Sequence, residues 1–130
     1  LNVDLAIVDK RREKAGESEA MNIIGAVDGK ECILIDDMTD SGGTLINAVS
    51  ALLSNGAKQV VAYVTHGVLS NGAAADIDRS ELTELITTDT IQASDQVLSA
   101  KKIRTITLAP LIGEAIRRIA NDESISKMFD

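Results

Sequence analysis

The residues best suited to chemistry lie in one run, in which an apolar stretch leads into acids, hydroxyls and glycines. Residues 33–35 are apolar, and they are followed by Asp36, Asp37, Met38, Thr39, Asp40, Ser41, Gly42, Gly43 and Thr44. Paired glycines permit backbone conformations closed to other residues and let a ligand approach the backbone closely. If a helix begins there, the amides of residues 41–44 point outward and form an anion site, to which the hydroxyls of Ser41 and Thr44 add donors.

Asp36 and Asp37 need a separate explanation, because carboxylates beside a phosphate site repel the ligand. They are useful if they accept hydrogen bonds from sugar hydroxyls, or if Mg²⁺ lies between them and the phosphates. A phosphate site next to acceptors for vicinal hydroxyls describes a pentose phosphate. Three other interpretations remain. Paired acids also hold Mg²⁺ in receiver domains, Asp40 and Ser41 are suitable helix caps, and a glycine-rich turn alone is weak evidence.

Short apolar runs and helical periodicity predict the elements that must position these residues. Strands are expected at residues 5–8, 22–27, 31–35, 59–65, 85–88 and 103–108. One helix is expected after Gly43, with an end at Asn55-Gly56, and another from Pro110. A weaker helix is expected at 71–78 and a short turn at 124–129. The two strong helices carry apolar stripes, formed by Leu45, Ile46, Val49, Leu52 and Leu53 in the first and by Leu111, Ile112, Ala115, Ile116 and Ile119 in the second.

The order of these elements predicts an α/β fold with a mainly parallel sheet flanked by helices. Aromatic residues make up only 2%, so the core must be aliphatic, which suits a sheet covered on both faces. The turn at residues 28–30 predicts a hairpin between the second and third strands. The polar segment 10–20 has no periodicity and is interpreted as a mobile loop. In such a sheet, a ligand is expected at the carboxyl ends of the strands.

Composition excludes several classes of protein. The 130 residues fit one domain, and a net charge of −7 disfavours nucleic-acid binding. No apolar run is long enough for a bilayer and no signal-peptide pattern opens the chain, so no membrane partner is expected. The lone Cys32 cannot form an internal disulfide, which fits a reducing cytoplasm, and it is expected to be buried. The chain begins with Leu1 close to a predicted strand, which suggests part of a longer protein, with a processed terminus as the alternative.

The run ILIDDMTDSGGT resembles the phosphoribosyl-diphosphate binding loop of type I phosphoribosyltransferase folds. Upstream, IVDKRR at residues 7–12 places cations on the charged segment, where they could neutralise transferred phosphates or simply form a solvated basic patch. DKRR ahead of DDMTDSGGT resembles ribose-phosphate diphosphokinase. The runs EAMNIIG, VTHGVLSNGAA, TTDTI and EAIRRIANDESISKMF extend the similarity along the chain. The resemblance covers residues 1–130 as one phosphoribosyltransferase-like domain, corresponding to the carboxyl-terminal half of that enzyme.

The resemblance implies that Mg·ATP donates its β,γ-diphosphate to the 1-hydroxyl of ribose 5-phosphate. Lys10 and Arg12 would be the catalytic cations, and Arg12 would also contact the sugar phosphate. Asp36 and Asp37 would hold the ribose hydroxyls, with Mg²⁺ as a further use for them. The 5-phosphate would be bound by Asp40, Ser41, Gly42, Gly43 and Thr44. An allosteric site for phosphate or ADP between subunits of a homo-oligomer, a hexamer in the family, would use Ser124, Ser126 and Phe129, for which a helix cap and a docking side chain are the alternative.

Several features limit what the resemblance implies. Gly16 stands where many relatives have Asn in the catalytic loop. The family's amino-terminal half brings most of the ATP site and a metal-binding His, so the 130 residues alone are expected to be inactive. A salvage phosphoribosyltransferase and a non-catalytic associated subunit are the other candidates, although Lys10, Arg12 and the paired acids argue against a silent relative. His66 matches the family pattern and is interpreted as a structural residue at a strand end.

Overall fold

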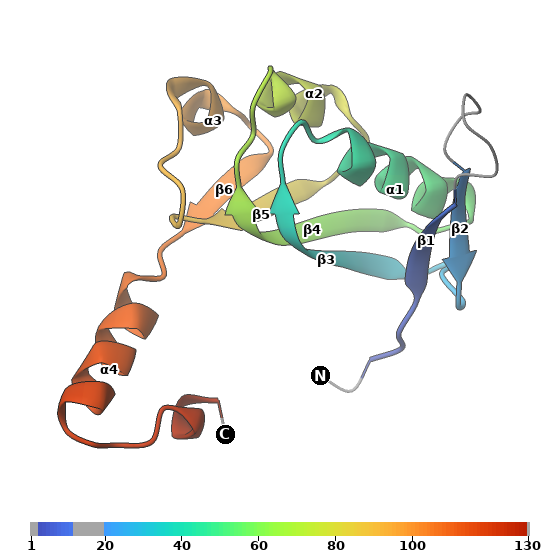
Figure 1. Cartoon of the computed structure of the whole chain (residues 1–130). Coiled ribbons are helices and arrows are strands. Elements are labelled where there is room, and N and C mark those ends of the chain that lie inside the picture. Colours follow the sequence, from blue (N-terminus) through green and yellow to red (C-terminus); the bar gives the residue numbers. More distant parts are fainter. Residues whose placement is uncertain (1–2, 12–19, 130) are drawn as a thin grey trace.

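The computed structural model describes residues 3–11 and 20–129, and its centre is a four-stranded parallel sheet (Figure 1). The strands are β3 (Glu31–Thr39), β4 (Gln59–Gly67), β5 (Glu84–Thr88) and β6 (Ile103–Ile106), hydrogen-bonded in that order. All three neighbouring pairs are parallel. Parallel strands require crossover connections, and helices provide them here. The predicted α/β fold with a parallel sheet is therefore confirmed.

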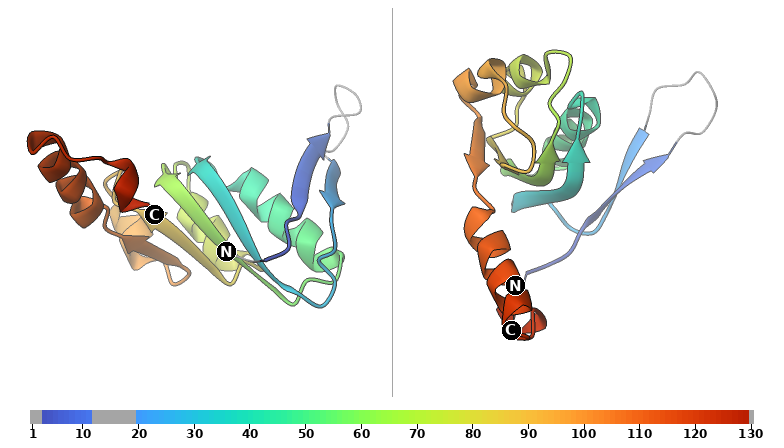
Figure 2. Two further views of the ribbon diagram at one scale, coloured as in Figure 1. Left: turned by 90° about the horizontal axis from the view of Figure 1, so that it is seen from below. Right: turned by 60° about the vertical axis from the view of Figure 1, so that its left-hand side comes forward.

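Three helices lie on one side of this sheet, as Figures 1 and 2 show together. They are α1 (Gly43–Ser54), α2 (Ala73–Arg79) and α3 (Asp95–Ser99). The predicted stripe of α1 faces the core, since Leu45, Val49 and Leu52 are buried. They pack in an aliphatic cluster with strand residues such as Val60 and Leu85. The short helix α3 lacked a sequence prediction because its five residues carry too little periodicity.

The ends of the predicted helices agree with their sequence signals. Gly56 has φ of 90° just beyond α1, and the amides of Gly56 and Ala57 donate to Leu53 O and Leu52 O. This is the left-handed helix end expected from Asn55-Gly56. Helix α4 (Ala109–Ala120) begins at Pro110 to within one residue, and a 3₁₀ turn, η1 (Ser126–Met128), occupies the predicted turn near the end.

The predicted position of the hairpin is wrong. The antiparallel pair is formed by β1 (Ile7–Arg11) and β2 (Ala20–Ile24), with Ile7 opposite Ile24. The turn at residues 28–30 exists, but Gly29 N donates to Gly56 O at the end of α1, and β3 then pairs in parallel with β4. The turn therefore redirects the chain instead of joining paired strands. Both ends of the segment interpreted as a loop at 10–20 belong to strands, and residues 12–19 lie outside the described residues.

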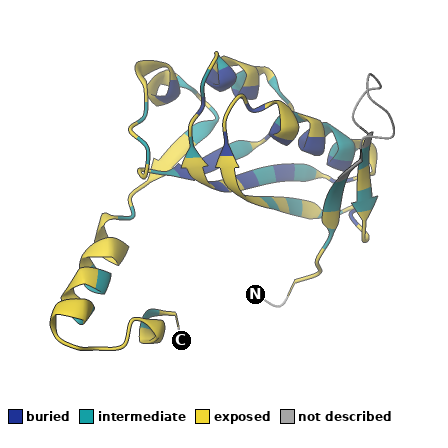
Figure 3. Ribbon diagram, in the orientation of Figure 1, coloured by how far each residue is buried: buried dark blue, intermediate teal, exposed yellow. Residues whose placement is uncertain are grey.

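The expectation of helices on both faces of the sheet is also wrong for the described residues. On the second face, Ile33, Ile35 and Tyr63 are 62%, 77% and 42% exposed. Helix α4 leads away from the sheet beyond β6, and none of its residues is buried, so its apolar stripe is exposed (Figure 3). Cys32 is half-buried, which corrects the prediction of full burial, and partial desolvation raises the pKa of its thiol.

No helix in the part of the chain that the structure describes could cross a membrane. The longest, α1 and α4, have 12 residues each, whereas a bilayer requires about 20.

The aliphatic core should dominate stability. Leu85 is fully buried between the sheet and its helices, whereas Leu98 on α3 is 70% exposed. We expect Leu85→Ala to lower the free energy of unfolding by about 2–5 kcal/mol and Leu98→Ala to change it by less than about 0.5 kcal/mol. Urea denaturation followed by circular dichroism measures both. Equal effects of the two substitutions would contradict this assignment of the core.

Candidate functional site

The loop singled out in the sequence lies where the first parallel strand passes into the first helix. Strand β3 continues through the paired acids to Thr39, four residues beyond the predicted strand end at 35. Residues 40–42 then turn the chain into α1. Gly42, the N-cap of that helix, has φ of 79°, a left-handed conformation that favours glycine. The turn therefore depends on Gly42 itself.

The start of α1 is left open by this turn. No side chain caps the helix, no acidic residue lies in its first turn, and the first intrahelical hydrogen bond runs from Ile46 N to Gly42 O at 2.9 Å. The amides of Gly43, Thr44 and Leu45 thus find no acceptor among residues 3–11 and 20–129. By contrast, α3 is capped by the Ser94 hydroxyl, which accepts from Val97 N. Free amides at a helix start, together with the helix dipole, form an anion site.

The polar side chains around this helix start are accessible to a ligand. Ser41 and Thr44 are exposed, and so are Asp36, Asp37 and Asp40. Thr44 and Asp36 line one cleft of about 440 Å³, whose remaining walls are mostly apolar. The structure thus brings a hydroxyl from α1 and a carboxylate from β3 to the wall of one cavity.

The side chains of the adjacent acids Asp36 and Asp37 do not point into the same cavity. Since both belong to β3, their side chains leave the strand on opposite faces. Asp36 faces the cleft that contains Thr44, and its Oδ1 accepts a hydrogen bond of 2.9 Å from Asp37 N. The Asp37 carboxylate has no hydrogen-bond partner in the described part of the chain. A sugar lying across the end of β3 could contact both carboxylates, whereas a ligand confined to the cleft would meet Asp36 alone.

Asp40 has a structural contact that the sequence did not suggest. Its Oδ1 accepts a hydrogen bond from the Ser70 hydroxyl, in the connection between β4 and α2. Beside it, Thr39 O accepts from Val68 N at 3.0 Å and from Leu69 N at 3.3 Å. These bonds hold the loop between β3 and α1 against the neighbouring connection. Ser70 was missed because a single serine in a turn carries no signal for a partner 30 residues away.

Too few side chains gather at the site to bind a metal ion by themselves among the described residues. Among residues 3–11 and 20–129, no group of three His, Cys, Asp or Glu side chains could hold a metal ion. Mg²⁺, however, is commonly bound by one or two carboxylates together with substrate phosphates. The exposed carboxylates of Asp36 and Asp37 at the end of β3 fit that second arrangement, in which the substrate completes the coordination.

The structure describes the backbone of only one of the two predicted catalytic cations. Lys10 belongs to β1, where it lies opposite Met21 of β2. Arg12 lies outside the described residues. The position of the two cations relative to the start of α1 therefore stays a prediction.

His66 lies at the carboxyl end of β4, next to Met38 of β3. Its Nδ1 is 2.9 Å from the hydroxyl of Thr90, just beyond β5. Thr88 donates a bond of 2.6 Å to Thr65 O in the same cluster. These contacts tie two strand ends together, in keeping with a structural interpretation of His66.

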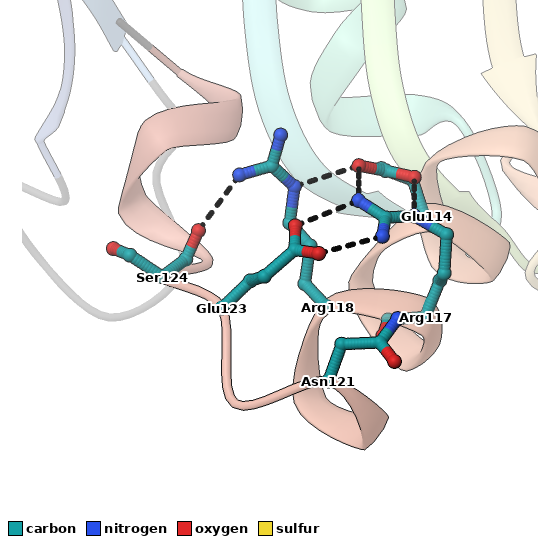
Figure 4. A network of polar contacts seen from close by, with 6 residues as sticks. All are labelled: Glu114, Arg117, Arg118, Asn121, Glu123 and Ser124. Atoms are coloured by element: carbon teal, nitrogen blue, oxygen red, sulfur yellow. Dashed lines mark hydrogen bonds and ion pairs between the residues drawn. The ribbon is translucent and has the colours of Figure 1, made fainter.

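The end of α4 carries a network of ion pairs (Figure 4). Arg117 bridges Glu114 and Glu123 with four hydrogen bonds of 2.8–2.9 Å. Arg118 donates to Glu114 at 2.7 Å and to Ser124 O at 2.9 Å. The hydrogen bonds from the two guanidinium groups lower the pKa of Glu114 to about 2.

This network contacts one of the three residues of the predicted allosteric site, Ser124. The hydroxyls of Ser124 and Ser126 are 2.9 Å apart, and the backbone of Ser124 is held by Arg118. Phe129 is 73% exposed, so it does not dock on the described residues. A ligand role for these three residues stays a prediction.

A family model described as "Phosphoribosyl synthetase-associated domain" matches residues 6–130. Curated relatives named "Ribose-phosphate pyrophosphokinase" include one from Hyphomonas neptunium, 62% identical over 99% of this chain, and one from Mesorhizobium japonicum, 63% identical over 99%. The chain spans only 41% and 42% of the length of these two relatives.

A solved structure agrees in fold and in sequence. The crystal structure of phosphoribosylpyrophosphate synthetase from Mycobacterium smegmatis superposes with a TM-score of 0.74 over 79% of this chain, at 36% identity. The match covers 34% of that protein. Both comparisons therefore relate this chain to a part of longer enzymes.

The two glycines before α1 should respond differently to alanine. Gly42→Ala forces a side chain into the left-handed conformation and should destabilise the fold by about 1–2 kcal/mol. Gly43 starts the helix, and the nearest atom to an added Cβ would be 3.9 Å away, so Gly43→Ala should leave stability unchanged or slightly raised. Urea denaturation of both variants checks this. Equal destabilisation would contradict the geometry of the turn.

The network at the end of α4 should be sensitive to acid. The pKa of Glu114 falls from an ordinary 4.5 to about 2, so its contribution is complete above pH 4.5 and is lost as the pH falls toward 2. NMR titration of the Glu114 carboxyl carbon should give a midpoint near 2, and the amide of Ser124 should shift in the same range. In Glu114→Gln, that shift should be absent. A Glu114 midpoint near 4.5 would show that the ion pairs do not persist in solution.

Proposed function

This chain belongs to the phosphoribosyl synthetase-associated domain family, and we propose that it provides the ribose 5-phosphate site of a ribose-phosphate diphosphokinase. The observation that carries the proposal is the uncapped start of α1, directly beyond the carboxylates of Asp36 and Asp37. Donors for a phosphate and acceptors for sugar hydroxyls are adjacent there. The names of the curated relatives, which refer to ribose phosphate, support the same substrate.

In the proposed complex, each part of the loop binds one part of the sugar. The amides of Gly43, Thr44 and Leu45, with the hydroxyls of Ser41 and Thr44, bind the 5-phosphate. Asp36 accepts a hydrogen bond from a ribose hydroxyl on the cleft side of β3, and Asp37 accepts one from the other side. Asp40, held by Ser70, and Gly42 shape the loop around the phosphate.

The proposed reaction is diphosphoryl transfer. The 1-hydroxyl oxygen of ribose 5-phosphate forms a bond to the β-phosphorus of ATP, and the hydroxyl proton is released to solvent. The bond from that phosphorus to the α,β-bridging oxygen breaks, and AMP leaves with the electron pair. Positioning and neutralisation of charge dominate such reactions. Mg²⁺, when bound with ATP, supplies part of the neutralising charge. Lys10 and Arg12 supply the rest from the segment beyond β1, and Arg12 also contacts the sugar phosphate.

The proposal assigns this chain to the carboxyl-terminal half of a cytoplasmic homo-oligomeric enzyme. Since the chain spans 41% of the Hyphomonas neptunium relative, the ATP site is expected to come mainly from residues outside it. Phosphate or ADP as effectors would bind near Ser124, Ser126 and Phe129.

Calorimetric titration with ribose 5-phosphate, with and without Mg²⁺, tests the binding site. We expect Asp36→Asn, Asp37→Asn and Gly43→Ala each to weaken binding about tenfold or more, which corresponds to about 1.4 kcal/mol. Asp122→Asn, a remote exposed position with φ of 54° that Asn tolerates, is the control and should bind normally. Unchanged affinity in the first three variants would refute this site.

Release of AMP from ATP and ribose 5-phosphate tests whether turnover requires residues outside this chain and the two cations. The 130-residue chain alone should give no turnover. In a full-length relative, Ala at the position equivalent to Lys10 should abolish turnover while sparing binding of the sugar. Ala at the position equivalent to Arg12 should abolish turnover and also weaken that binding. Robust AMP release by the isolated chain would contradict the proposed dependence on residues outside it.

A further inference from the structure

The carboxylate of Asp40 lies in the loop to which the proposed function assigns a phosphate, although a carboxylate repels that ligand. In the proposed complex, Asp36 and Asp37 accept hydrogen bonds from ribose hydroxyls. Asp40 comes after them, two residues before the N-cap Gly42 of α1. Like charges that lie close together raise the free energy of a complex. The loop therefore needs a means of keeping this carboxylate away from the phosphate.

Asp40 is also suited to occupy the start of α1 itself. Asp side chains commonly accept hydrogen bonds from backbone amides two or three residues further along, and Asp is among the preferred caps of helix starts. For Asp40, those amides belong to residues 42 and 43. A carboxylate bonded there would take donors that the phosphate needs. In the structure, however, no side chain caps this helix.

The hydroxyl of Ser70 directs the Asp40 carboxylate elsewhere. Ser70 lies in the connection between β4 and α2, 30 residues further along the chain, and its hydroxyl donates to Asp40 Oδ1. Ser70 is half-buried, whereas Asp40 is exposed. The bond therefore turns an otherwise exposed carboxylate toward the connection, and it occupies an oxygen that the amides of α1 could use.

The backbone on both sides of Ser70 is in a left-handed conformation. Leu69 has φ of 50° and Asn71 has φ of 53°. Such conformations cost free energy for residues other than glycine, and they persist where the surrounding structure fixes them. The direction of the Ser70 side chain thus depends on a strained connection.

Hydrogen bonds and burial hold this connection at both ends. The side chain of Leu69 is buried in the aliphatic core, and its amide donates to Thr39 O at 3.3 Å. On the other side, Ser70 O accepts from Ala73 N, at the start of α2, at 3.0 Å. Ser70 is therefore presented to Asp40 by a backbone with fixed neighbours, which suits a residue that has to position another.

The turn before α1 also packs against this part of the fold. Gly42 is buried, and a Cβ added there would lie 3.7 Å from side-chain atoms of Ala73 and Ile77 of α2. Helix α2 follows the connection that carries Ser70. Packing therefore brings the connection and the loop together, and the bond between Ser70 and Asp40 then selects the direction of the carboxylate.

We propose that Ser70 is a positioning residue of the sugar phosphate site. Its hydroxyl holds the Asp40 carboxylate away from the amides at the start of α1 and leaves them open to the phosphate. This inference rests on the proposed function, because it is the phosphate that requires these amides. Ser70 itself does not contact the sugar phosphate in this account.

Amide hydrogen exchange of the 130-residue chain without ligand tests the positioning by itself. In Ser70→Ala, the released carboxylate should bond the amides at the start of α1 and slow exchange at residues 42–44 about tenfold. In Ser70→Ala/Asp40→Ala, exchange should return to the rate of Asp40→Ala alone. Ser99→Ala is the matched control, because it removes an exposed hydroxyl of α3 that donates to Asp95 O at 2.8 Å. It should leave exchange at residues 42–44 unchanged.

Calorimetric titration with ribose 5-phosphate gives a second measurement on the same variants. Ser70→Ala should weaken binding about tenfold, which corresponds to about 1.4 kcal/mol and lies within the range of a helix cap. The double variant should bind as tightly as Asp40→Ala, because the Ser70 hydroxyl has nothing to restrain once the carboxylate is gone. Ser99→Ala should bind normally.

Two results would overturn the proposal. If removal of the Ser70 hydroxyl weakens binding equally with and without the Asp40 carboxylate, Ser70 contacts the sugar phosphate directly. If exchange at residues 42–44 is unchanged in Ser70→Ala, the bond is only structural. The exchange measurement needs no ligand, so slowed exchange in a chain that fails to bind ribose 5-phosphate would support the control of Asp40 by Ser70 and refute the sugar site alone.

Discussion

The left-handed turn at Gly42 is the constraint on which the site depends. It allows β3 to pass directly into α1, and it leaves the first amides of the helix without an acceptor in the described part of the chain. Any residue other than glycine would meet a conformational cost there. Capping by a side chain, as in α3, would satisfy the same amides but would close the site. An uncapped helix start is thus a local cost in stability that makes sense if a ligand supplies the missing acceptor.

The rest of the fold holds this helix start at the end of the sheet. The stripe of α1 buries Leu45, Val49 and Leu52 against β4, so the helix cannot drift from the strand that precedes it. Hydrogen bonds from the connection after β4 to Thr39 and Asp40 fix the loop from the other side. The same fold leaves Ile33, Ile35 and the stripe of α4 exposed. Packing and hydrogen bonds fix the start of α1, whereas among the described residues helices cover only one face of the sheet.

Local signals predicted much of this architecture. Helical periodicity and the Asn55-Gly56 end placed α1, Pro110 placed the start of α4, and apolar runs placed the parallel strands. The hairpin was misplaced because a tight turn at residues 28–30 shows only that the chain reverses, and not which strands pair. Burial of Ile33, Ile35 and the α4 stripe was expected from hydrophobicity alone, which cannot reveal whether a partner element is present. The bond between Ser70 and Asp40 depends on tertiary packing and left no trace in either local sequence.

The central claim is that the backbone amides at the start of α1 bind the phosphate of a sugar phosphate. Amide chemical shifts of residues 41–45 in ¹⁵N-labelled protein, followed during titration with ribose 5-phosphate and separately with ribose, test it most directly. The account predicts saturable shifts of these amides with ribose 5-phosphate and much weaker ones with ribose. Equal responses to the two ligands, or shifts confined to other parts of the chain, would contradict it.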